Sequence, residues 1–269
     1  MLYRTRFKKE IVCEFLPPSH NLLRRASPTG PNRLRRARPP ARPSSKVIIF
    51  CAGMPGVPKH KEAMQFWSAR GFWTFFPRYR GTWESDGEFL KHSPEKDVLD
   101  IIDALPKGFS DLWSEKEFKI TSPKIFIIGG SFGGPAAILA SRDKRVIKAV
   151  GISPVIDWRA DAPDEPMDKL GRHIPKAFGQ TYRFSPKNWA RLSRGEFYNP
   201  IDEMGTIDGS KLLLFHAKDD RVVPFGPTKK FVKQTGANLI TFPRGGHFGS
   251  SDSLLAKFSK PIQAFFSKK

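Results

Sequence analysis

Hydrophobic residues form short runs along the chain, and these runs alternate with segments of helical periodicity. The run at 47–52 (VIIFCA) is rich in β-branched residues and lies between a polar segment and a glycine, which predicts a buried strand. Similar runs predict further strands at 72–76, 125–128, 146–152, 212–215 and 238–242. Apolar residues at helical spacing predict helices at 59–70, 93–105, 135–141 and 254–266.

Strands that alternate with helices are joined by right-handed crossovers, which pair the strands in parallel. The pattern therefore predicts the α/β class, with a doubly wound and mostly parallel sheet. Residues 9–15 (KEIVCEF) are expected to add an antiparallel edge strand. Residues 157–199 break the alternation with a polar stretch that contains several prolines, and we expect a small helical cap insertion there, over the carboxyl edge of the sheet.

The net formal charge of +20 is concentrated near the N-terminus. Residues 1–46 hold 12 of the 46 lysines and arginines but 2 of the 26 acidic residues. Prolines interrupt the arginines over 22–45 and prevent a regular helix. We expect 1–45 to be a basic N-terminal segment, an edge strand plus an Arg/Pro-rich loop, before a catalytic domain at 46–269. A contact of this arm with nucleic acid or an anionic surface is the less favoured interpretation, because no aromatic platform accompanies the charge.

Composition and motifs exclude several classes of protein. The longest mainly apolar stretch, 125–140, contains four glycines and is shorter than the roughly 18 residues of a membrane-spanning helix. Cys13 and Cys51 cannot form a disulfide framework, and the charged first residues do not match a secretory signal, so a cytoplasmic protein is expected. The sequence has no CxxC, HExxH or dinucleotide fingerprint, so we expect no metal and no cofactor.

The strongest chemical motif is GGSFGG at 129–134, which follows the strand at 125–128 and precedes a helix. A serine on such a strand-to-helix turn has strained backbone angles, and its hydroxyl is exposed above the sheet. The neighbours two positions away must be small, and Gly129 and Gly133 meet this demand. A phosphate-binding loop would continue with lysine and then serine or threonine, whereas a Pro-Ala pair follows here. The motif therefore predicts that Ser131 is a nucleophile.

A serine hydroxyl needs a general base. On this architecture the acid and then the histidine follow the serine along the chain. His247 lies in a glycine-rich loop after the strand at 238–242, and it is the one histidine beyond the acidic pair Asp219 and Asp220. The chain order therefore predicts His247 as the base. Either aspartate of the pair is placed to hold the imidazole tautomer, and Asp157 is the alternative acid.

The oxyanion that forms during acyl transfer needs two backbone N–H donors. One is expected at Phe132, directly after the serine. The other is expected at Met54, in the loop after the first central strand, where Pro55 has no N–H and Gly53 allows close approach of the backbone.

These residues resemble the α/β-hydrolase fold family, and within it the branch of dienelactone hydrolases and prolyl oligopeptidase (peptidase S9) catalytic domains. The resemblance covers about residues 46–268 and rests on GGSFGG at 129–134, AKDDRVVP at 217–224, GGH at 245–247 and the Gly53-Met54 turn. It implies that the triad acid is the first aspartate of a DxxV pattern, which is Asp219 here.

The sequence thus predicts a serine hydrolase that cleaves a carboxylic ester, thioester or small amide through an acyl-enzyme on a triad of Ser131, Asp219 and His247. The expected partner is a small-molecule acyl substrate or a short peptide. A serine peptidase of prolyl oligopeptidase type is the alternative enzyme. From another class, the alternative is a catalytically lapsed binding protein that uses its basic arm.

Overall fold

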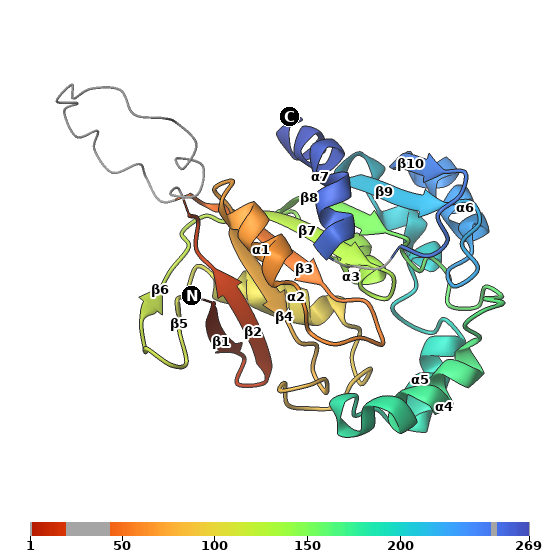
Figure 1. Ribbon diagram of the computed structural model, residues 1–269, viewed down its shortest axis with the longest axis horizontal. Coiled ribbons are helices and arrows are strands. Elements are labelled where there is room, and N and C mark those ends of the chain that lie inside the picture. The colour runs from red at the N-terminus through yellow and green to blue at the C-terminus, as the bar shows by residue number, and fades with distance from the viewer. Residues whose placement is uncertain (1, 20–43, 249–251, 269) are drawn as a thin grey trace.

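The computed structural model describes residues 2–19, 44–248 and 252–268 (Figure 1). Its centre is a sheet in which the described residues contribute eight strands, in the order β1-β2-β4-β3-β7-β8-β9-β10. These strands are β1 (Tyr3–Phe7), β2 (Ile11–Leu16), β3 (Lys46–Cys51), β4 (Trp73–Pro77), β7 (Lys124–Gly130), β8 (Val146–Ile152), β9 (Leu212–Ala217) and β10 (Asn238–Phe242). The six strands from β4 to β10 pair in parallel, and β1 and β2 are antiparallel. The predicted fold class is confirmed.

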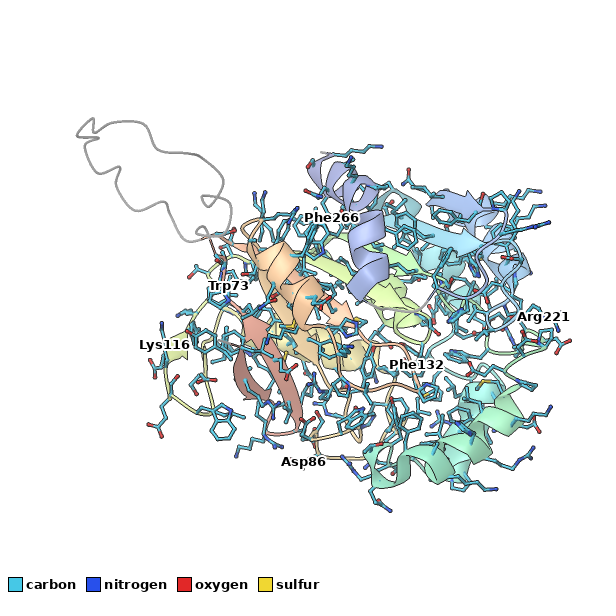
Figure 2. All side chains as sticks on the ribbon, in the orientation of Figure 1. Trp73, Asp86, Lys116, Phe132, Arg221 and Phe266 are labelled. Atoms are coloured by element: carbon cyan, nitrogen blue, oxygen red, sulfur yellow. The ribbon has the colours of Figure 1, made fainter. Side chains whose placement is uncertain are left out.

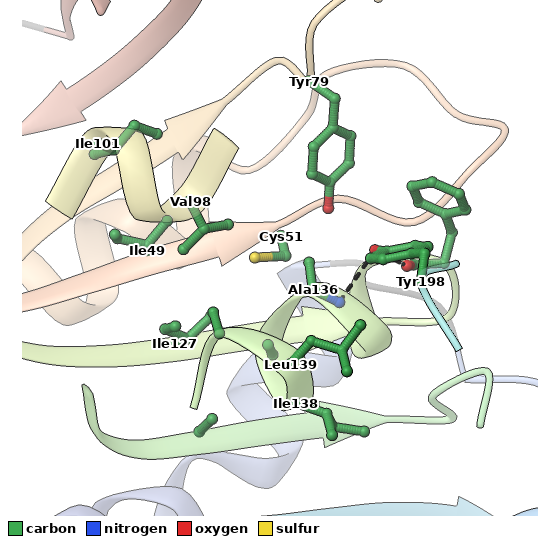
Figure 3. Packing of buried hydrophobic residues seen from close by; sticks show 14 of the residues in the cluster. Ile49, Cys51, Tyr79, Val98, Ile101, Ile127, Ala136, Ile138, Leu139 and Tyr198 are labelled. Carbon is green, nitrogen blue, oxygen red and sulfur yellow. Dashed lines mark hydrogen bonds between the residues drawn. The ribbon is translucent and has the colours of Figure 1, made fainter. Parts of the chain in front are cut away.

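Helices cover both faces of the sheet because successive strand residues point to opposite sides. In β3, Ile48 and Phe50 join the core under α1 (Lys61–Ser68) and α7 (Asp252–Ser267). Ile49 packs on the other face with Val98, Ile101 and Ile127 (Figure 3). That second face is covered by α2 (Glu95–Ala104), α3 (Gly133–Ala140) and α6 (Phe225–Thr235). The sheet is therefore doubly wound, as the alternation of elements predicts.

The N-terminal edge differs from the expectation of one strand at 9–15. Two strands, β1 and β2, form a hairpin there, in which Thr5 pairs with Cys13. The small hairpin of β5 (Phe109–Ser110) and β6 (Glu117–Phe118) follows α2, and its loop contacts the outer strand, since Leu112 N–H donates to Arg4 O (2.7 Å). Arginines occupy every second position within β1, and β5 and β6 have only two residues each. None of these strands therefore forms an apolar run in the sequence.

Two helices lie in the polar stretch 157–199, which we call the insertion: α4 (Met167–Phe178) and α5 (Pro186–Ser193). They lie together beyond the end of the sheet (Figure 1). Ser185 caps α5 by accepting from Asn188 N–H, and Trp189 Nε1 donates to Met167 O (3.0 Å), which ties the two helices. Short 3₁₀ helices complete the connection to β9: η2 (Gly179–Thr181), η3 (Pro200–Thr206) and η4 (Gly209–Lys211).

Most of the Arg/Pro-rich loop expected at 22–45 lies outside the described residues, since residues 20–43 are not described. Among the helices that are described, none combines the length and the apolar character needed to cross a membrane.

Candidate active site

Ser131 lies on the turn between β7 and α3, with a φ angle of 51°. A positive φ is rare for a residue with a side chain, and it persists only where the surroundings hold it. Here Ser131 N–H donates to Ile152 O (2.9 Å), and Ser131 O accepts from Gly134 N–H (2.9 Å). The turn therefore has the strained geometry that the motif predicts for a nucleophile elbow.

The glycines on either side of Ser131 lie where no side chain fits. A Cβ atom on Gly129 would lie 2.0 Å from Gly133 O, and a Cβ on Gly133 would lie 2.2 Å from Cys51 O. Both contacts are with backbone atoms, which cannot rotate away. The small residues of the motif are thus required by the close approach of β7, α3 and the end of β3.

Gly129→Ala is therefore expected to lower the free energy of unfolding by about 1–3 kcal/mol, the usual cost of overpacking a buried site. Urea unfolding would measure the loss. Gly205→Ala is the matched control, because a Cβ built there meets nothing within 4 Å beyond its chain neighbours and its own helix backbone. Equal stability of the two variants would contradict the close packing of the turn.

His247 and Asp220 form a hydrogen-bonded pair, with His247 Nδ1 2.9 Å from Asp220 Oδ2. An ionised carboxylate accepts only, so Nδ1 carries the proton and Nε2 is left as the basic nitrogen. Burial alone would raise the pKa of Asp220. Hydrogen bonds from His216, His247 and Val223 N–H outweigh burial and hold this pKa well below its usual range. Asp220 is therefore a buried anion aimed at the imidazole.

The structure contradicts the expectation that Asp219 contacts His247. The Asp219 carboxylate is exposed and accepts from Gly246 N–H (2.9 Å) and Gly245 N–H (3.2 Å) instead. The turn after β9 directs the two neighbouring aspartates differently: Asp219 holds the backbone of the glycine loop, and Asp220 holds the imidazole at its end. The alternative acid, Asp157, accepts from Arg159 Nε (2.7 Å).

A second histidine, His216, lies fully buried beside Asp220. Its Nε2 is 2.9 Å from Val223 O and 3.4 Å from Asp220 Oδ2, and its Nδ1 is 2.9 Å from Thr228 Oγ1. A carbonyl oxygen accepts only, so Nε2 is the protonated nitrogen. His216 thus contacts both the Asp220 carboxylate and the backbone of the turn, which gives it a structural role at the end of β9.

The loops that carry Met54 and Phe132 are both held by tyrosines of the insertion. Tyr182 Oη lies 3.0 Å from both the N and the O of Gly56, two residues after Met54. Tyr198 Oη donates to Phe132 O (2.6 Å) and accepts from Ala136 N–H (3.1 Å), the contact drawn in Figure 3. No local sequence pattern marks these tyrosines, because their partners lie 126 and 66 residues away along the chain.

Two cavities meet at Ser131. The larger, about 660 Å³, is also lined by His247, Met54 and the loop that follows β3. The smaller, about 40 Å³, is mostly apolar and is also lined by Phe132, which lies near the insertion helices (Figure 2). Four residues line both cavities: Met54, Ser131, Glu165 and Val222. Ser131, His247, Met54 and Phe132 thus lie around one cavity system, and Asp220 contacts His247 from outside the cavity lining. Glu165 also lines both cavities and has no counterpart among the predicted site residues.

Among the residues that the structure describes, no group of three or more His, Cys, Asp or Glu side chains is arranged to hold a metal ion.

Comparison with solved structures finds similar folds at low sequence identity. Esterase Pf2001 of Pyrococcus furiosus has a TM-score of 0.61 at 13% identity, over 99% of this chain and 89% of that chain. Est1E of Butyrivibrio proteoclasticus, with ferulic acid bound, has a TM-score of 0.60 at 17% identity, over 98% and 99%. Acylaminoacyl peptidase of Pyrococcus horikoshii has a TM-score of 0.64 at 15% identity, over 100% of this chain but 41% of that one. These likenesses show the α/β-hydrolase fold.

No curated protein matches the sequence. Residues 58–269 match the model of the prolyl oligopeptidase family (peptidase S9), so the matched region covers well over half of the chain. The protein therefore belongs to the prolyl oligopeptidase family of hydrolases.

Proposed function

We propose that this protein is a serine hydrolase whose triad is Ser131, His247 and Asp220, and that it cleaves carboxylic esters, thioesters or small amides. The observation that carries the proposal is the hydrogen bond of His247 to buried Asp220 (2.9 Å), because His247 lines the same cavity as Ser131, a serine with positive φ. Membership of a hydrolase family supports it. Asp220 replaces Asp219 as the proposed acid.

In the proposed reaction Ser131 Oγ attacks the substrate carbonyl carbon and transfers its proton to His247 Nε2. The hydrogen bond to Asp220 keeps the other imidazole proton on Nδ1 and stabilises the imidazolium. The N–H groups of Met54 and Phe132 are proposed to donate to the oxyanion. The intermediate then collapses, the leaving group takes the proton from His247, and the acyl group stays on Ser131. Water, deprotonated by His247, releases the acid in the second half of the reaction.

The scissile bond is an ester, a thioester or a small amide in this proposal, and family membership favours a short peptide as the second candidate substrate. The larger cavity, with about 660 Å³, has room for more than a single small acyl group. Comparing kcat/KM for 4-nitrophenyl esters of increasing acyl length with that for acylated dipeptide amides would separate the two.

The direct test is labelling with a fluorophosphonate, which reacts with activated serines. Peptide mapping of the labelled protein is expected to place one adduct on Ser131. An adduct at another residue would overturn the assignment of Ser131 as the nucleophile. No labelling at all would overturn the proposed function and would favour the non-catalytic binding protein.

A further inference from the structure

Glu165 lies where the two cavities meet, on the part of the insertion that precedes α4. Four residues line both cavities, and Glu165 is the charged one among them. The other three are Ser131, Met54 and Val222. Its side chain is half-buried. Glu165 therefore borders the space that a substrate bound at Ser131 would occupy.

Glu165 differs from the neighbouring acidic residues in its surroundings. Asp164 pairs with Arg221 (2.9 Å), and Asp157 pairs with Arg159 (2.7 Å), so these arginines already have carboxylate partners. Burial raises the pKa of Glu165, and the basic groups that act against this rise are His247 and His173. A carboxylate removed from water without a close permanent cation is unfavourable, so a cation that enters the cavity would gain interaction energy there.

The remaining charged groups of the larger cavity do not offset Glu165. Buried Arg78 is paired with Glu14 (2.9 Å) and Glu84 (3.4 Å). Lys59 and Glu62 are both exposed and of opposite sign. The charge that a substrate group meets close to Ser131 is therefore that of Glu165.

We propose that Glu165 selects substrates that carry a positively charged group, an ammonium or a protonated amine, next to the scissile bond. The inference rests on the proposed hydrolase function, because it concerns the same cavity. It makes Glu165 a specificity-determining residue.

Pairs of esters with the same shape and different charge test this proposal. Acetylcholine and 3,3-dimethylbutyl acetate place the charge on the alcohol side. The phenyl esters of trimethylammonioacetate and 3,3-dimethylbutanoate place it on the acyl side. The measured quantity is the ratio of kcat/KM for the cationic ester to that for the neutral ester, compared between variants so that the intrinsic reactivity of each ester cancels.

Glu165→Gln is expected to lower this ratio about tenfold for at least one pair, the effect of one partly buried charge contact. Asp164→Asn is the matched control, since it removes the same charge one residue away, and it should leave the ratio unchanged. A ratio that Glu165→Gln does not change for either pair would overturn this inference while the proposed function stands. A ratio that both variants lower equally would also overturn it, because the effect would come from net charge. Wild-type protein that hydrolyses none of the four esters and resists fluorophosphonate would overturn the proposed function and the inference together.

Discussion

Ser131→Ala is expected to abolish fluorophosphonate labelling and to lower kcat for ester hydrolysis by about 10⁶-fold, the loss typical of a missing serine nucleophile. The alanine removes the attacking oxygen but keeps the backbone, whose N–H and C=O make the hydrogen bonds of the turn. Rates with a 4-nitrophenyl ester and gel fluorescence of the labelled protein would measure both effects.

The fold of this variant should be retained, because the contacts that Ser131 makes to Ile152 and Gly134 are made by backbone atoms. Thermal unfolding within about a degree of the wild type would establish that the loss is chemical. Ser110→Ala, at an exposed serine of β5, is the matched control and should label fully. Full labelling of the Ser131 variant would remove this serine from the proposed mechanism.

Asp220→Asn is expected to lower kcat by about 10⁴-fold, as for other triads whose aspartate becomes an amide. The amide can donate where the carboxylate only accepts, so it no longer enforces the Nδ1–H tautomer of His247 and no longer stabilises the imidazolium. Steady-state kinetics with the ester used for the serine variant would show the loss.

Asp219→Asn is the control, with the same chemical change one residue earlier. Its side chain contacts the backbone of Gly245 and Gly246 and not the imidazole, so the loss should be well below that of Asp220→Asn. The opposite ranking would return the role of acid to Asp219, and the His247–Asp220 hydrogen bond would then be structural.

The parts of the fold that could be predicted are those with a local pattern. Strand β3 is a continuous apolar run because both of its faces are buried. Ser131 lies in a motif whose glycines are required because a Cβ atom there would clash with nearby residues of the motif or with the end of the adjoining strand. Strand β1, in which two arginines interrupt the sequence at the edge of the sheet, lacks such a run and was not predicted.

The choice between Asp219 and Asp220 could not be made from the sequence. Asp219 and Asp220 have identical side chains, so the residue type does not distinguish them. The backbone angles of the turn decide which carboxylate points inward. The family pattern favoured Asp219, whereas His247, 27 residues away from Asp220, meets the second aspartate. Glu165 and Tyr182 were missed for a related reason: their partners and cavity neighbours come from loops distant in the sequence.

The two tyrosine contacts of the insertion have a consequence for protein engineering. A segment that covers an active site is usually the first part exchanged when a new substrate is wanted. Here the same segment carries Tyr182, which holds the loop of Met54, and Tyr198, which holds the carbonyl of Phe132. Replacing the segment wholesale would therefore release both loops, and a chimera would lose rate even on the original substrate. Exchange is expected to succeed only where the graft keeps a tyrosine at both anchor points.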